Sequence, residues 1–137
     1  MTSRGRLLAA LIAALLLAWL FLGASLTPDS SGMGTHRQLG LPPCGWVAAF
    51  NKPCPTCGMT TAFTYAAHGM ARASLVAQPF GTLVALGVAV GFWVSLHAAC
   101  TGVATGRVYA FLLRPHWVWA ALALLAAAWT YKLVVTG

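Results

Sequence analysis

Carboxylate side chains are almost missing from this chain. Asp29 is the single acidic residue among 137, and charged residues of either sign make up only 7% of the sequence. Paired carboxylates for general acid–base catalysis therefore cannot be assembled from one copy of the chain. A Gly-x-Ser-x-Gly nucleophile motif, a glycine-rich phosphate loop and a His-Glu-x-x-His zinc motif are absent as well. These absences argue against an ordinary hydrolase and favour a non-enzymatic role, although they leave the question of catalysis open.

The basic residues also lack the arrangement that nucleic-acid binding requires. Eight lysine and arginine side chains give a formal net charge of +7, but they are scattered singly between apolar runs. No cluster or aromatic-interleaved basic patch is present, so we expect no nucleic-acid partner. Anionic headgroups of a lipid bilayer are the expected partner for this charge. The 60% hydrophobic content excludes an ordinary soluble domain.

Three long apolar runs dominate the sequence and predict an all-α integral membrane protein. The expected transmembrane helices cover about residues 7–25, 80–101 and 117–135. A single membrane domain is expected over 1–137, in which 26–79 form an extracytoplasmic loop and a short interfacial helix. No charged residue lies in the middle of a run, which disfavours a transporter that works alone.

Two arginines before the first run predict the orientation of the chain. Arg4 and Arg6 place the N-terminus in the cytoplasm by the positive-inside rule. A cleaved signal peptide is the alternative, but the apolar run is longer than the usual ~7–15 residues and favours an uncleaved anchor. Near the end of the last run, Lys132 is expected to extend its ammonium group to the outer surface.

Three of the four cysteines lie between residues 44 and 57. The order Cys-Pro-Thr-Cys-Gly at 54–58 places two thiols close enough to bind one metal or each other. Proline fixes one φ and glycine tolerates a positive φ, which together predict a tight turn. A helix of about three turns is expected from Gly58 to His68, followed by a second helical turn over 70–77. Because this helix begins at Cys57, its dipole is expected to lower the pKa of that thiol.

The cysteines of this cluster can be bridged, bound to a metal, or simply reduced and packed independently. A disulfide among Cys44, Cys54 and Cys57 is expected on an oxidising face of the membrane, and it leaves one thiol over. Alternatively, the three thiolates bind zinc or copper, with His36 as the fourth ligand. Cys100 lies at the far end of the second span and cannot reach this group.

Small residues recur every fourth position along the second span. They form one stripe that consists of Gly87, Gly91, Ser95 and Ala99. Such a stripe favours close contact with another helix. The expected partner is another helix of this chain, another membrane protein or a second copy in a homo-oligomer.

The cysteine stretch also resembles a known family. The order Cys-Pro-Thr-Cys-Gly-Met-Thr-Thr-Ala-Phe at 54–63, with Cys44 ten positions earlier, is similar to domain-of-unknown-function family 2752, a group of small bacterial membrane proteins. The resemblance covers about residues 44–81. This chain has Thr61 where the family usually has arginine, and Gln78 where asparagine is usual. The resemblance implies a multi-pass protein of the bacterial inner membrane and no particular reaction.

Together these features predict a non-enzymatic accessory or structural membrane protein with a cysteine-stabilised extracytoplasmic turn. The alternative hypothesis is an extracytoplasmic protein that uses the same cysteines for thiol redox chemistry or for binding zinc or copper.

Overall fold

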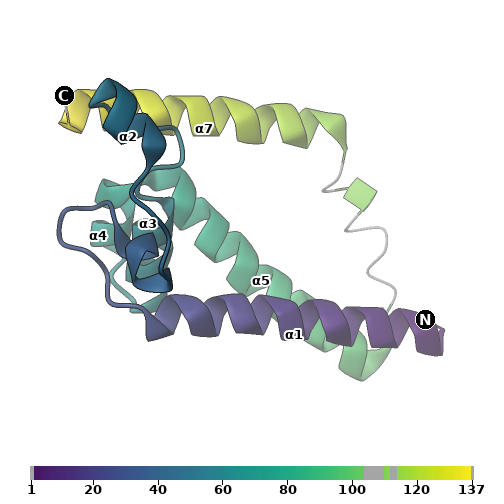
Figure 1. The fold of residues 1–137 in the computed structure, drawn as a ribbon. Helices are drawn as coiled ribbons and strands as arrows, with labels where there is room; N and C mark the ends of the chain where they lie inside the picture. The colour runs from purple at the N-terminus through teal and green to yellow at the C-terminus, as the bar shows by residue number, and fades with distance from the viewer. Residues whose placement is uncertain (1, 104–109, 112–113, 137) are drawn as a thin grey trace.

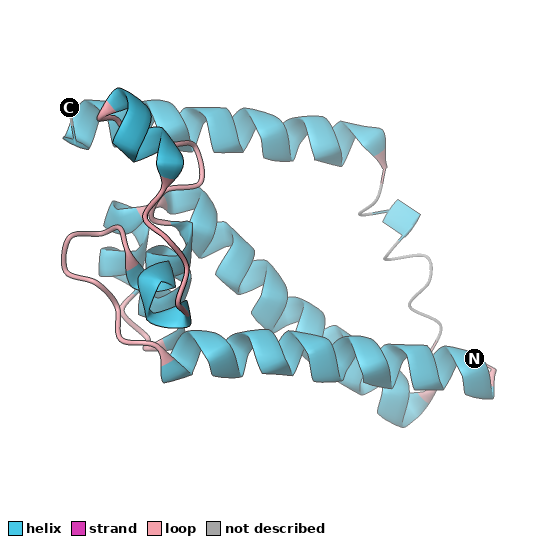
Figure 2. Ribbon diagram, viewed as in Figure 1, coloured by secondary structure: helices cyan, strands magenta, loops and turns pink. Residues whose placement is uncertain are grey.

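The part of the chain that the structure describes consists of helices joined by loops, as Figure 2 shows. The computed structural model describes residues 2–103, 110–111 and 114–136, and no strand occurs among them. The helices run in the order shown in Figure 1: α1 (Ser3–Ser25), the 3-10 helix η1 (Thr35–Leu39), α2 (Gly45–Phe50), α3 (Met59–Ala67), α4 (Ala71–Ala77), α5 (Pro79–Thr101) and α7 (Pro115–Thr136).

Within the described residues, three helices are long and apolar enough to cross a membrane: α1, α5 and α7. The first two contain 23 residues each, and at 1.5 Å per residue they reach about 34 Å, longer than the ~30 Å hydrocarbon core of a bilayer. Large apolar side chains such as Phe21, Trp93 and Trp119 lie exposed on their outer surfaces. The chain is an all-α membrane protein with several spans, as its apolar runs predict.

Helices α1 and α5 pack against each other with their ends in opposite order (Figure 1). Near the start of α1, the Arg6 side chain donates hydrogen bonds from Nε to the Ala99 carbonyl (3.0 Å) and from Nη2 to the Cys100 carbonyl (3.1 Å). These carbonyls belong to the last turn of α5, where a cation is favoured by the helix dipole. Arg6 therefore joins the two helices at the end of the molecule opposite the short helices.

The stripe of small residues on α5 only partly faces α1. A Cβ atom at Gly91 would lie 3.2 Å from Leu16 Cδ1 of α1, and the Ser95 side chain is fully buried. A Cβ atom at Gly87 would meet nothing within 4 Å. Whether this stripe also contacts a second protein remains a prediction.

Two glycines allow α3 to approach both long helices closely. A Cβ atom at Gly23 of α1 would lie 2.6 Å from the Phe63 ring. A Cβ atom at Gly81 of α5 would lie 2.9 Å from Ala62 Cβ and 3.1 Å from the Met59 carbonyl oxygen. Because side chains at these two positions would collide with α3, the glycines let α3 lie against α1 and α5.

A buried polar network joins α3, α4 and α5. The Ser74 hydroxyl donates to the Ala62 carbonyl (2.6 Å) and lies 2.7 Å from the Thr82 hydroxyl. Ser74 is fully buried and Thr82 nearly so. Satisfied hydrogen bonds of this kind fix the relative position of helices that apolar contacts alone would hold less specifically.

Helix α7 attaches to the rest of the protein through its C-terminal half. Trp129 Nε1 donates to the Pro53 carbonyl (3.0 Å), and Lys132 Nζ donates to the Ala77 carbonyl (2.7 Å). Only 3% of the Lys132 side chain is exposed. The expectation that Lys132 extends to the outer surface is therefore wrong, because backbone carbonyls inside the fold accept its hydrogen bonds.

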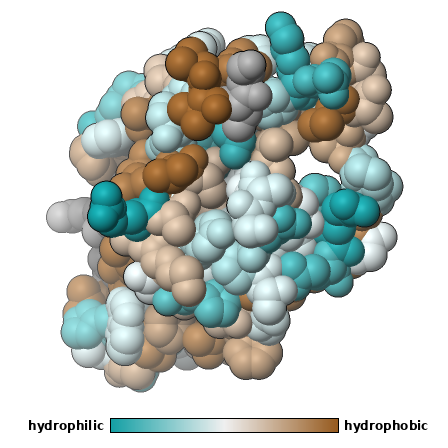
Figure 3. Space-filling view, turned by 90° about the vertical axis from the view of Figure 1, so that its left-hand side faces the viewer, coloured by the Kyte–Doolittle hydropathy of each residue, from teal (hydrophilic) through white to brown (hydrophobic). Residues whose placement is uncertain are grey.

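The short helices and loops gather at one end of the molecule, where the C-terminal part of α7 also lies (Figure 1). Figure 3 views this end, and hydrophilic residues spread across its middle with hydrophobic patches above them. The predicted helix over 58–68 corresponds to α3, for which Gly58 and His68 are the capping residues. The second predicted turn corresponds to α4. This end of the molecule contains the cysteine cluster.

Candidate metal centre

Helix α2 places the first two cysteines of the cluster. Cys44 immediately precedes α2, and the chain reverses after it at Asn51, whose φ is +51°. The left-handed conformation of Asn51 ends the helix and turns the chain back toward Cys54. This six-residue helix was not predicted from the sequence, although Asn51 is a residue type that commonly ends helices.

A tight turn then brings Cys57 close to Cys54. The Cys57 amide donates to the Cys54 carbonyl (3.0 Å), and Gly58 follows with a φ of +85°. A Cβ atom at Gly58 would lie 2.7 Å from the Gly32 carbonyl oxygen and 3.1 Å from the Ala77 carbonyl oxygen. Both the conformation and the crowding require glycine here, so the turn predicted from the motif is present.

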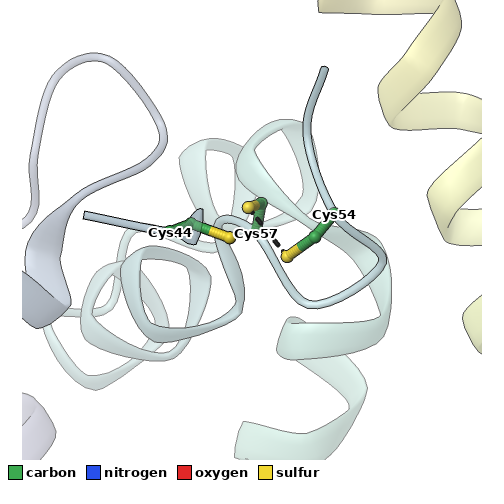
Figure 4. A group of neighbouring side chains, drawn as sticks. All are labelled: Cys44, Cys54 and Cys57. Atoms are coloured by element: carbon green, nitrogen blue, oxygen red, sulfur yellow. Dashed lines mark hydrogen bonds between the residues drawn. The ribbon is translucent and has the colours of Figure 1, made fainter. Parts of the chain in front are cut away.

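The three sulfur atoms converge, as Figure 4 shows. The Sγ atoms of Cys44, Cys54 and Cys57 all lie within 4.8 Å of one another. Cys54 Sγ and Cys57 Sγ are 2.9 Å apart and in hydrogen-bond contact. The structure therefore brings together all three cysteines that the sequence analysis selected.

The predicted histidine ligand lies beside this group and outside it. His36 belongs to η1 and lines a cavity of about 630 Å³ that the three cysteines also line. Its ring nitrogens are not among the ligand atoms that lie within 4.8 Å of one another. Cys100 lies at the opposite end of α5, next to the Arg6 contact.

Hydrogen bonding and burial give the two thiols of the turn different pKa values. Burial alone would raise the pKa of Cys54, but hydrogen bonds from Cys57 and Thr56 outweigh it and hold this pKa below its ordinary value of 9.0. Burial and the hydrogen bond to Cys54 raise the pKa of Cys57 to about 12. The prediction that the helix dipole lowers the pKa of Cys57 is therefore wrong, and Cys54 is the more acidic thiol.

The Gln78 side chain binds the backbone of the cysteine turn. Its side chain is fully buried, and its Nε2 donates to the Pro55 carbonyl (3.0 Å) between the two cysteines. Its Oε1 is buried and has no hydrogen-bond partner. Gln78 directly precedes α5, so the start of this span and the cysteine turn are held together.

Thr61 connects α3 to the loop that carries His36. Its hydroxyl lies 2.8 Å from the Thr35 hydroxyl, and both side chains are buried. Thr35 also accepts a hydrogen bond from the Asp29 amide (3.0 Å). The Thr61 hydroxyl thus helps to hold η1 beside the cysteines.

The stretch that contains the cysteine turn matches a known protein family. Residues 44–92 match the model described as "Protein of unknown function (DUF2752)". The resemblance to this family is confirmed. The DUF2752 match begins at Cys44, contains the whole cysteine turn with α3 and α4, and ends within α5. No curated protein and no solved structure matches the chain.

Proposed function

We propose that this protein is a membrane-anchored metal-binding protein that holds one soft cation, zinc(II) or copper(I), between Cys44, Cys54 and Cys57. The proposal is carried by the convergence of three Sγ atoms within 4.8 Å of one another. A tetrahedral zinc–thiolate site with bonds of about 2.3 Å places its sulfur atoms about 3.8 Å apart. Small side-chain movements bring the three thiols to that separation.

The surroundings of the cluster favour an exchangeable ion. Cys44 and Cys54 are partly exposed, and all three cysteines line the same open cavity as His36. A fourth ligand from His36, from water or from a partner protein has room to approach the ion from this cavity. A site with an open position is typical of metals that act or are transferred, whereas purely structural zinc sites are closed. We therefore assign the protein an accessory role in holding or delivering a metal.

The arginines that precede the first apolar run support the orientation that we propose. Arg4 and Arg6 lie at the end of α1 opposite the cysteine cluster. The positive-inside rule then places the N-terminus in the cytoplasm and the cysteines on the outer face of a bacterial inner membrane.

A second candidate function is thiol–disulfide exchange, in which the disulfide of a partner protein is reduced to two thiols while Cys54 and Cys57 are oxidised to a disulfide. The unequal pKa values of these two thiols favour it, because the more acidic Cys54 supplies the attacking thiolate in such reactions. In this case Cys44 remains a thiol outside the reacting pair.

Metal analysis of the purified protein in detergent distinguishes the two functions. After reduction and exposure to zinc(II) or copper(I), we expect one bound ion per chain in the wild type and in Cys100→Ser, which serves as the matched control. Cys44→Ser, Cys54→Ser and Cys57→Ser should each lose the ion. A wild type that binds neither metal, and whose untreated form is two hydrogens lighter than its reduced form, would overturn the metal proposal in favour of the disulfide.

A further inference from the structure

Lys132 is the only charged side chain among the buried residues in the part of the chain that the structure describes. It lies in the last turns of α7, where most neighbouring side chains are exposed. Moving an ammonium group away from water is costly unless opposite charge or several hydrogen bonds compensate for it. The groups around the Lys132 Nζ atom must therefore compensate for the cost of burying its charge.

The Lys132 Nζ atom lies against backbone groups next to the cysteine turn. It donates to the Ala77 carbonyl (2.7 Å) and lies 3.4 Å from the Gly32 carbonyl oxygen. It is also 3.0 Å from the position that a Cβ atom would take at Gly58, the residue after Cys57.

We propose that Lys132 is the counter-cation of the thiolate centre and that the centre it completes holds a divalent ion. Three thiolates carry three negative charges and a zinc(II)-class ion supplies two positive charges, so the loaded site keeps one negative charge that the Lys132 ammonium group offsets. A monovalent ion on the same three thiolates would leave two negative charges, of which Lys132 would offset one. This inference rests on the proposed metal-binding function and selects the class of ion.

The same contact ties the third span to the occupied centre. Trp129, one helical turn before Lys132, already holds α7 to the Pro53 carbonyl (3.0 Å). Trp129→Phe removes this attachment without changing any charge, whereas Lys132→Met removes the charge and keeps a chain of similar length. Comparing the two variants therefore separates the effect of the Lys132 charge on zinc affinity from the effect of the packing of α7.

Zinc titration of the full-length protein in detergent, with zinc(II) alone and a competing chelator, tests the role of the charge. Lys132→Met should weaken zinc binding by at least about tenfold, the order expected for removing one nearby unit charge at an effective dielectric constant of about 20. Lys132→Arg, which keeps the charge, should bind more tightly than Lys132→Met. Lys52→Met, which removes an exposed lysine two residues from Cys54, should bind like the wild type, as should Trp129→Phe.

Amine labelling of the wild type provides a test that needs no variant. Lys52 and Lys132 are the two lysines of the chain, so each can be followed by peptide mass after reductive methylation. Zinc should slow methylation of Lys132 and leave Lys52 unchanged, because the occupied centre attracts the Lys132 side chain and holds it in its buried position.

The outcomes separate this inference from the function on which it rests. A wild type that binds no zinc refutes the proposed metal-binding function. A wild type that binds zinc, together with an equally tight Lys132→Met or with unchanged labelling of Lys132, refutes the role of Lys132 alone. If Lys132→Met fails to fold, the labelling result decides.

Discussion

The two thiols of the cysteine turn should react at very different rates in the metal-free, reduced protein. At pH 8, a thiol with a pKa of about 12, such as Cys57, is ionised in about one molecule in 10⁴. Cys54, whose pKa lies below 9.0, is ionised in at least about one molecule in ten. The ratio of reactive thiolate is therefore about 10³ in favour of Cys54.

Intrinsic nucleophilicity reduces this ratio without reversing it. A thiolate of lower pKa is the weaker nucleophile, and a Brønsted coefficient of ~0.45 lowers its rate about threefold for each pKa unit. Alkylation of Cys54 by iodoacetamide should therefore still proceed at least about tenfold faster than alkylation of Cys57. Burial of Cys57 increases the difference further.

Peptide mapping by mass spectrometry after timed alkylation between pH 7 and pH 10 measures both rates in one sample. The Cys57 rate should keep rising about tenfold per pH unit, since the whole range lies below its pKa. The Cys54 rate should level off once the pH passes its lower pKa. Thr56→Val, which removes the hydroxyl 3.3 Å from Cys54 Sγ, should slow the alkylation of Cys54 near pH 7. Equal rates, or faster alkylation of Cys57, would refute this assignment of the two thiols.

Three further substitutions test the packing, each by thermal unfolding of the purified protein in detergent. Gly81→Val should destabilise the protein strongly, because its Cβ atom would collide with α3, whereas Gly87→Val should have little effect; equal effects would contradict the close approach of α3. Ser74→Ala should lower the free energy of unfolding by about 1–3 kcal/mol because it leaves buried groups unpaired, and the exposed Ser25→Ala should change it far less. Arg6→Gln should lower it by about 0.3–1 kcal/mol through loss of a charged cap on α5, and an unchanged melting temperature would show that this cap contributes nothing.

Features that depend on neighbouring residues along the chain are the ones that sequence predicts well here. A long apolar run can satisfy its backbone inside a bilayer only as a helix, so α1, α5 and α7 follow from hydropathy. The turn at 54–58 follows from a proline and a glycine at fixed positions, and α3 follows from the residues after Gly58. Convergence of Cys44 with this turn was expected from proximity along the chain, and the structure brings the three sulfurs together.

Features that depend on packing between distant segments could not be predicted in this way. The pKa of Cys57 is set by burial and by its hydrogen bond to Cys54, whereas the sequence shows only its place before a helix. Lys132 near the end of an apolar run has the pattern of a lysine that extends to the membrane surface. Its burial depends on the loop that carries Gly32 and on the end of α4, which lie 100 and 55 residues away in the chain.

The shortage of carboxylates explains how the cysteine end is held together. With Asp29 as the sole acid, cationic and amide side chains from the spans must find other acceptors, and here they bind backbone carbonyls. Trp129 binds Pro53, Gln78 binds Pro55 and Lys132 binds Ala77, so the flanks of the turn are held from both α5 and α7. No substitution inside the turn removes a carbonyl acceptor, whereas loss of one donor from a span frees the turn on that side. The cysteine turn therefore depends on donors outside it, and Gln78 and Lys132 are the positions where substitution should change metal affinity without touching a ligand.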